Sequence, residues 1–185
     1  MRTEVNTKKL TECAAMIALS SVLSLVCIYQ APYGGKVTLG SMVPLVLVCA
    51  HIKEFKWGFF ACLSYSLVQM LLEFAVPPAA TVGSFFAVVL LDYIFAFTVI
   101  SLVNPILKLL KNQIVGVGIG AAIVLFFRFL CHFMTGILIW EAYAPSGQPV
   151  WLYSLIYNSG YMVPEIVITV VMSMAIYSVI LKRKK

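Results

Sequence analysis

Residues 114–140 read IVGVGIGAAIVLFFRFLCHFMTGILIW, and residues 150–181 form a second run that is nearly as apolar. A helix that crosses a bilayer needs about 20 predominantly apolar residues. Lipid cannot hydrogen-bond an exposed backbone, so segments that cross it must be helices or parts of a closed barrel. Barrels have short alternating segments, whereas these runs are long and continuous. This part of the chain therefore predicts a helical membrane protein.

The composition of the whole chain supports the same prediction. Hydrophobic residues make up 62% of the 185 residues and charged residues only 11%. An ordinary soluble domain is roughly a quarter charged, so too few polar groups remain to cover a soluble fold. The net charge of +6 does not indicate nucleic-acid binding, because the basic residues lie in short clusters between the apolar runs.

Breaks rich in Pro and Gly, such as Pro77-Pro78, divide the chain into six apolar segments. Helices are predicted over 10–29, 39–51, 57–76, 84–103, 114–140 and 150–181. The second is short for a full crossing. With no long linker and no internal repeat, we expect an all-α fold of six transmembrane helices that forms one domain over residues 1–185.

Basic residues are distributed unequally between the two sides of this predicted bundle. The terminal segments and the second and fourth loops hold eleven: Arg2, Lys8, Lys9, Lys53, Lys56, Lys108, Lys111, Lys182, Arg183, Lys184 and Lys185. The other three loops hold Lys36 alone. Because cytoplasmic loops carry the excess of Lys and Arg, both termini are predicted in the cytoplasm, and the protein in the cell membrane.

Ionisable residues within the apolar runs are candidates for function. A charged residue at the centre of a membrane helix costs about 2.5–3.5 kcal/mol, so such residues are usually functional. They are Glu73, Asp92, Arg128, His132 and Glu165. Glu73 lies near the outer end of its helix, where its side chain can reach the interface. Glu165 has no predicted partner.

Three polar residues on three different helices fall at one depth. Asp92, His132 and Asn158 each lie about eight residues, or roughly 12 Å, from the outer end of their helix. Polar residues scattered for structural reasons alone would not be expected to share a level. We therefore expect them to face one pocket in the outer half of the bundle.

The helix at 114–140 carries a stripe of functional side chains. Arg128, His132, Gly136 and Trp140 recur every four residues and so lie along one slowly rotating face. Tyr153 begins the next helix, although it lies about 140° around that helix from Asn158. It can share the pocket only if the start of the helix is frayed. Trp140 and Tyr153 could equally belong to an interfacial aromatic belt.

A carboxylate surrounded by aromatic rings suits a small, flat organic cation. The carboxylate supplies the opposite charge, and the rings supply cation–π attraction and stacking. The chain has no glycine-rich phosphate loop and no His, Cys or carboxylate spacing typical of a metal site. No cofactor or metal is therefore expected, and any ATP-driven step must come from partner proteins.

The same residues carry a resemblance to a known family. The run from His132 to Gly160, HFMTGILIWEAYAPSGQPVWLYSLIYNSG, resembles the YuaJ-like thiamine-specific S component (substrate-binding subunit) of energy-coupling factor (ECF) importers. LLDY (residues 90–93), PYGG (32–35) and KLTECAAMIA near the amino terminus resemble further family motifs. The likeness spans nearly the whole chain.

The resemblance implies a six-helix protein that binds thiamine from outside the cell. It would work with one transmembrane coupling protein and two ABC-type ATPases, and would not itself be an enzyme. The ligand contacts that it implies are Asp92, Tyr93, Arg128, His132, Gly136, Trp140, Tyr153 and Asn158. Two positions depart from the family: Asp92 replaces a Glu, and Gly35 replaces a Trp in the first loop.

A small-residue motif in the first helix predicts a protein interface. Ala14 and Ala18 lie four residues apart, a spacing that lets another membrane helix approach closely. We expect this surface to contact the coupling protein.

Three alternatives to thiamine capture remain open. The chain could be an S component for another vitamin, which would share the helices but not the signature from His132 to Gly160. It could be a stand-alone proton-coupled transporter that uses Asp92, Arg128, His132 and Glu165 as a relay. It could also be a membrane enzyme in which His132 and Asp92 form an acid–base pair.

Overall fold

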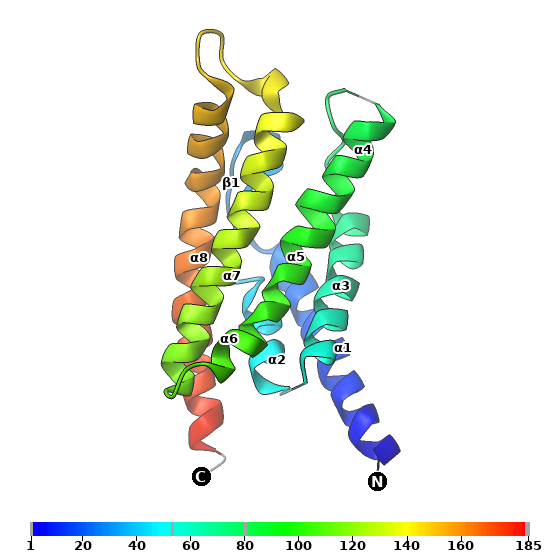
Figure 1. The fold of residues 1–185 in the computed structure, drawn as a ribbon, viewed down its shortest axis with the longest axis vertical. Helices are drawn as coiled ribbons and strands as arrows, with labels where there is room; N and C mark the ends of the chain where they lie inside the picture. The colour runs from blue at the N-terminus through cyan, green and yellow to red at the C-terminus, as the bar shows by residue number, and fades with distance from the viewer. Residues whose placement is uncertain (1, 53, 80, 184–185) are drawn as a thin grey trace.

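The computed structural model describes residues 2–52, 54–79 and 81–183. Lys53, Lys184, Lys185 and the side chain of Arg2, which the charge count included, lie outside the described part. The fold is mostly helical. Long helices run nearly side by side, and α1 begins at the same end of the molecule at which α8 ends (Figure 1). We call this the lower end, as drawn.

Six helical segments make up the bundle. They are α1 (Arg2–Leu25), α2 (Val43–His51), α3 (Phe55–Leu72), a continuous run from Val82 to Lys108, α7 (Gln113–Leu138) and α8 (Val150–Lys182). The predicted boundaries of the last two are correct to within two residues. Among the described residues, four helices are long and apolar enough to cross a membrane: Phe55–Leu72, Val82–Lys108, Gln113–Leu138 and Val150–Lys182.

The run from Val82 to Lys108 contains five differently wound pieces. These are α4 (Val82–Val88), the π-helix η2 (Val89–Phe95), α5 (Ala96–Thr98), the 3₁₀ turn η3 (Val99–Leu102) and α6 (Val103–Lys108). The predicted stop at Asn104-Pro105 is wrong. Pro105 falls in the first turn of α6, where a missing N–H costs little, and the Asn104 amide donates to the carbonyls of Cys49 and Ile52 at the end of α2.

The predicted first helix is wrong at both ends, and a small antiparallel hairpin takes its last residues. The helix begins at Arg2 and ends at Leu25. Strand β1 (Cys27–Gln30) then pairs with β2 (Lys36–Thr38) across the turn η1 (Pro32–Gly34). The fold is therefore not purely α-helical. The hairpin passes behind α7 and α8 in the view of Figure 1.

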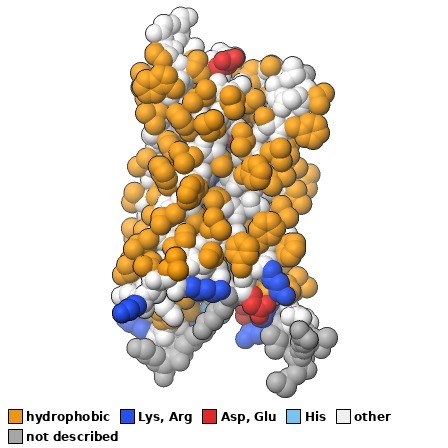
Figure 2. Space-filling model, viewed as in Figure 1, with side chains coloured by type: hydrophobic (Ala, Val, Ile, Leu, Met, Phe, Trp, Pro, Cys, Tyr) orange, Lys and Arg blue, Asp and Glu red, His pale blue; other side chains and the backbone are white. Residues whose placement is uncertain are grey.

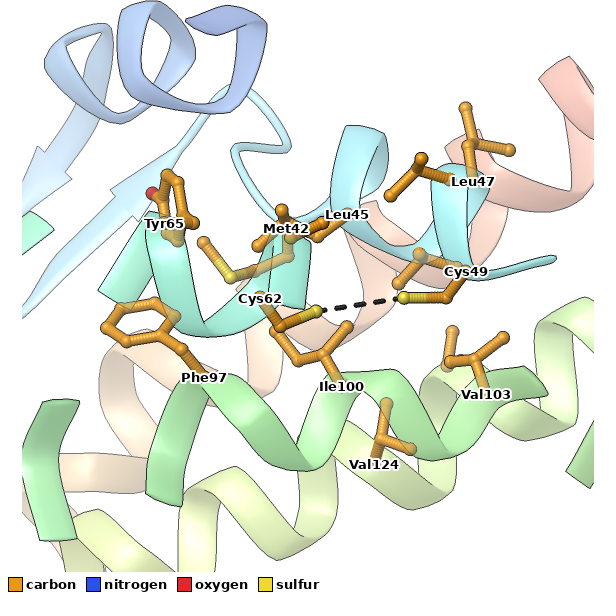
Figure 3. Close-up of a cluster of buried hydrophobic side chains, with 14 of the residues drawn as sticks. Met42, Leu45, Leu47, Cys49, Cys62, Tyr65, Phe97, Ile100, Val103 and Val124 are labelled. Atoms are coloured by element: carbon orange, nitrogen blue, oxygen red, sulfur yellow. Dashed lines mark hydrogen bonds between the residues drawn. The ribbon is translucent and has the colours of Figure 1, made fainter. Parts of the chain in front are cut away.

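The short helix α2 is the centre of the hydrophobic core. Every residue from Val43 to Ala50 is buried, and nine residues span only about 14 Å, so α2 is a core helix enclosed by the others. Figure 3 shows its side chains meeting those of α3, α5, η3 and α7. Cys49 and Cys62 lie there with their sulfurs 3.7 Å apart. This core fills the lower half of the bundle.

The kind of side chain on the surface changes along the long axis of the molecule. On the face shown in Figure 2, hydrophobic side chains cover the middle of the molecule, and the Lys and Arg side chains in view lie at the lower end. An apolar belt between polar ends is the surface expected of a protein embedded in a bilayer.

Candidate substrate-binding site

A cavity of about 430 Å³ is lined by residues of α3, η2, α7, α8 and the hairpin. The hairpin lies in the upper half of the bundle (Figure 1). The volume of the cavity is typical of small-molecule sites. The eight site residues implied by the sequence all line it: Asp92, Tyr93, Arg128, His132, Gly136, Trp140, Tyr153 and Asn158. The structure thus brings together residues from three helical segments that are up to 66 positions apart in the chain.

The Asp92 carboxylate contacts three side chains at the cavity wall. His132 Nδ1 lies 2.9 Å from its Oδ1, which also accepts a hydrogen bond from the Thr135 hydroxyl. Trp140 Nε1 donates to Oδ2 at 3.2 Å. The carboxylate is 8% exposed, and charged groups are stable at such sites only when paired and hydrogen-bonded. These three contacts hold Asp92 against α7.

The π-helix η2 explains how Asp92 and Tyr93 both face inward. Adjacent residues of an α-helix point about 100° apart, and π segments occur mostly as local features at functional sites. Both side chains are buried here. The Tyr93 hydroxyl donates to Glu73 O at 2.6 Å and accepts from Ala75 N–H at 2.8 Å. Tyr93 therefore joins η2 to the chain that leaves α3.

Asn158 and Gly136 lie where α7 and α8 pack most closely. The Asn158 amide donates to Ser154 O at 2.9 Å, and its Oδ1 accepts from the Tyr161 hydroxyl at 2.7 Å. A Cβ added to Gly136 would lie 2.9 Å from Ser154 Cβ. Gly136 thus lets α8 approach α7, in addition to lining the cavity.

Tyr153 reaches the cavity without fraying of the helix. Its N–H donates to Pro149 O at 3.1 Å, so it belongs to the first regular turn of α8, and a frayed start is not required for it to line the cavity. The Tyr153 ring stacks on Tyr157 at 5.8 Å.

Two nitrogen atoms that line or border the cavity have no hydrogen-bond partner among the described residues. They are His132 Nε2 and Arg128 Nε, both buried. The Arg128 guanidinium lies over the Phe97 ring, 4.7 Å from its centroid, an arrangement that cation–π attraction favours. A buried polar atom without a partner is costly, and neither atom is exposed to the open space of the cavity.

Aromatic rings from the hairpin and the loop before α8 cover the upper part of the cavity. Tyr33 stacks on Tyr143 at 4.1 Å, and Tyr143 lies nearly parallel to Trp140 at 6.1 Å. Tyr33 has φ = 61°, a conformation that is rare for a bulky residue. Gly35 cannot carry a side chain in this arrangement, because a Cβ there would lie 2.6 Å from the Tyr161 ring.

The charges that line the cavity nearly balance. Three carboxylates (Glu73, Asp92 and Glu165) face two cations (Lys36 and Arg128). Lys36 forms an ion pair with Glu73, which also accepts from Gln69 at 3.0 Å. Glu73 therefore faces the cavity and the hairpin rather than reaching the interface alone, as its position had suggested. By formal charge, the carboxylates that line the cavity exceed its Lys and Arg residues by one.

Sequence reasoning missed the contributions of Thr135, Ser154, Tyr161 and the hairpin. Thr135 and Tyr161 each follow a predicted site residue by three positions, and this helical spacing could have identified them. The hairpin contributes through pairing between strands, which has no comparable local signal. Within the described ranges, no group of three or more His, Cys, Asp or Glu side chains could hold a metal ion.

The fold and the cavity together define a class: a multi-pass helical membrane protein with an internal cavity of small-molecule size. Comparison with known proteins gives the family. The family described as thiamine transporter protein (Thia_YuaJ) matches residues 10–185. The chain belongs to this thiamine transporter family, the S-component family that its sequence resembles, and it is a transporter-family protein rather than an enzyme.

Individual relatives agree with this assignment. The thiamine transporter ThiT of Bacillus subtilis is 32% identical over 179 residues, which cover 86% of this chain and 85% of the relative. ThiT of Lacticaseibacillus paracasei is 33% identical over 91 residues, 44% of this chain and 45% of that one. The structure of ThiT from Listeria monocytogenes has the same fold, with a TM-score of 0.76, 21% identity, and coverage of 96% of this chain and 97% of that one.

Proposed function

We propose that this protein captures thiamine from outside the cell in the cavity around Asp92 and delivers it inward as the S component of an ECF importer. Family membership supports the substrate, and one observation of the structure carries the proposal. A buried carboxylate, ringed by aromatic side chains, lines a cavity whose carboxylates exceed its cations by one. Thiamine carries one permanent positive charge, so its binding would balance the site.

Each cavity group matches a part of thiamine. The Trp140 and His132 rings can stack on the two heterocycles, and aromatic faces attract the cationic thiazolium. Asp92 supplies the opposite charge or pairs with the aminopyrimidine. Asn158 and Tyr153 can hydrogen-bond to the ligand, and Arg128, Tyr93 and Gly136 shape the wall.

The topology that fits this function has six membrane segments and both termini in the cytoplasm. The Lys and Arg side chains at the lower end (Figure 2) support this orientation through the positive-inside rule. The cavity then lies on the outer side. In this arrangement residues 1–185 act as one substrate-binding domain in the cell membrane.

Energy for uptake comes from partners, since the chain carries no nucleotide motif. We propose a transmembrane coupling protein and two ABC-type ATPases, with the coupling protein packed on Ala14 and Ala18 of α1. Both alanines are exposed on the bundle surface. Small exposed residues at this spacing allow close approach of a second helix.

The substrate can be tested directly. Purified protein is denatured, and the released small molecules are identified by mass spectrometry. We expect thiamine in about a one-to-one ratio, as tight binding to the folded state alone predicts. Release of a different vitamin, or of none after growth with added thiamine, would refute the proposed substrate.

The partner surface has a separate test. Ala14→Trp and Ala18→Trp should abolish uptake and co-purification with the coupling protein, while thiamine still quenches the tryptophan fluorescence of the isolated protein. Ala175→Trp, at another exposed alanine, serves as the control and should transport normally. Normal uptake with Trp at both α1 positions would show that this surface is not the interface.

A further inference from the structure

Glu165 is the one carboxylate within α8, and it is almost completely buried, with 4% of its surface exposed. It lies among apolar and small polar side chains in the middle of the bundle. A buried carboxylate is stable only when it is well hydrogen-bonded. The contacts of Glu165 therefore indicate why a charge is present at this position.

All the hydrogen bonds of Glu165 come from one short segment at the end of the hairpin. Oε2 accepts from the Thr38 backbone N–H at 2.8 Å. Oε1 accepts from the Thr38 hydroxyl at 2.6 Å, and the Ser41 hydroxyl lies 3.3 Å away. Ser41 N–H in turn donates to the Thr38 hydroxyl oxygen at 3.0 Å. Both carboxylate oxygens are thus committed to Thr38.

Thr38 occupies a position from which the whole hairpin can be held. It is the last residue of β2 and pairs with Cys27, the first residue of β1. The hairpin reaches from there across the cavity, where Tyr33, Gly35 and Lys36 form part of the wall. A contact at Thr38 therefore holds the end of the hairpin that joins it to the rest of the bundle.

The contacts at the other end of the hairpin are of a weaker kind. Tyr157 accepts from Gly35 N–H at 3.0 Å and donates to Pro32 O at 2.5 Å, both neutral hydrogen bonds. The Lys36–Glu73 pair is partly exposed, and exposed ion pairs contribute little. Charge-assisted hydrogen bonds in a dry site are stronger, and the Glu165–Thr38 contact is the most deeply buried charged attachment of the hairpin among the described residues.

We propose that Glu165 is a positioning residue that seats the hairpin across the cavity and thereby sets how slowly the bound molecule leaves. This inference rests on the proposed thiamine binding. Glu165 is one turn of α8 beyond Tyr161 and acts through Thr38 rather than through the ligand. Loosening the hairpin opens the exit but leaves Asp92 and the binding groups on α7 in place. Because Glu165→Gln also removes one of the three cavity carboxylates, Thr38→Val, which keeps that charge, is the deciding variant.

The kinetic test compares isosteric variants. Glu165→Gln replaces one carboxylate oxygen, which accepts a hydrogen bond from Thr38, by an amide NH₂ that cannot accept one. Thr38→Val removes the hydroxyl of Thr38 while keeping the shape of its side chain. Stopped-flow tryptophan fluorescence, with Trp140 as a cavity reporter, measures both rate constants for thiamine. We expect each variant to raise the dissociation rate about ten-fold, the effect of losing one strong hydrogen bond, with an unchanged association rate.

Two controls separate this role from general packing. Thr38→Ser retains the hydroxyl and should dissociate close to the wild-type rate. Thr169→Val alters another buried residue of the same face of α8, one turn beyond Glu165, whose hydroxyl has no partner among the described residues. It should leave both rates unchanged. If Glu165→Gln does not fold, the dissociation rate of Thr38→Val alone tests whether the Glu165–Thr38 contact slows release.

A second measurement requires no ligand. Hydrogen exchange of the peptide covering residues 27–41 should accelerate in Glu165→Gln and Thr38→Val but not in Thr169→Val. Wild-type dissociation rates in both variants would overturn the proposal. So would weaker binding in Glu165→Gln alone, because that result indicates direct contact with thiamine. If the wild type does not bind thiamine, the proposed function fails, whereas hydrogen exchange still tests the attachment.

Discussion

The upper and lower halves of the bundle differ in what fills them. Around the cavity, polar and aromatic side chains from α3, η2, α7, α8 and the hairpin leave a space of about 430 Å³. Below it, the side chains of α2 and its neighbours pack into a core (Figure 3). Met42, Tyr65 and Phe97 belong to both, as cavity wall and as core.

This difference bears on how a solute could cross. The polar site ends on the packed core, and protein interiors of this kind have few voids larger than a water molecule. The proton-relay alternative needs a polar path through this core. A site that ends on a core instead fits a subunit that captures its solute and depends on partners for release inward.

The largest effect is expected from removing a charge in the upper half, which should weaken thiamine binding. Asp92→Asn removes the charge of the upper site, and breaking a buried charge pair costs about 2–5 kcal/mol, or roughly thirty- to several-thousand-fold in the thiamine dissociation constant. Tryptophan fluorescence titration measures this change. Asp92→Glu should be much milder, because the family commonly has Glu at this position.

A control for Asp92 is available at the exposed Glu141, which lies outside the cavity wall. Glu141→Gln should bind thiamine as the wild type does. Near-wild-type affinity in Asp92→Asn would remove the carboxylate from the site.

The next effect concerns stability in the lower half. Ile100 is fully buried in η3, and Ile→Ala at such sites typically costs about 2–4 kcal/mol. Ile100→Ala should lower the thermal midpoint in detergent, while the folded fraction binds thiamine normally. The matched variant Leu102→Ala, at an exposed residue of the same turn, should change the midpoint little. Equal loss of affinity and stability in Ile100→Ala would show that the halves are not separable.

A smaller effect tests a single hydrogen bond at the site. Tyr161→Phe removes the hydroxyl that donates to Asn158 Oδ1 at 2.7 Å, so Asn158 loses its fixed orientation. One hydrogen bond is worth about 1 kcal/mol, which corresponds to roughly five-fold weaker thiamine binding. Tyr177→Phe, lower on the same helix, should bind normally. Indistinguishable titrations of the two variants would contradict a role for Tyr161.

The smallest effect is at the lower end, outside the membrane segments. Lys9 donates a hydrogen bond to Glu54, and this contact lowers the pKa of the Glu54 carboxyl below its usual range. A depressed carboxyl pKa contributes stability above the unfolded-state value and loses it as the pH falls through the folded-state value. Between neutral pH and about pH 3, the wild type should therefore lose slightly more thermal stability than Glu54→Gln. Identical pH profiles would show that the pair contributes nothing.

The sequence predicted the long helices well because their apolar runs exceed the thickness of a bilayer. The prediction from hydropathy failed where apolar residues form a strand instead of extending a helix. Residues 26–29 (VCIY) continue the hydrophobicity of α1, but β-branched and aromatic residues also suit strands. Their pairing with Lys36–Thr38 is a tertiary event that hydropathy does not report.

The same distinction holds for the site. The stripe from Arg128 to Trp140 follows from helical spacing alone, and all its members line the cavity. Glu165 was left without a partner because Thr38 lies 127 positions away. Local periodicity identifies residues on one helix face, whereas contacts between a hairpin and a distant helix require the folded arrangement.

The π-helix η2 also makes this site sensitive to changes in chain length. Hydrogen bonds in a π segment span five residues instead of four, so η2 is equivalent to an α-helix that has accepted one inserted amino acid. Deleting one codon between Val89 and Phe95 would restore the α-helical register. The helix residues on one side of the deletion would then be rotated by about 100° relative to those on the other side. A single reading-frame-preserving deletion could therefore turn Asp92 away from the cavity wall, although no membrane segment would become measurably shorter.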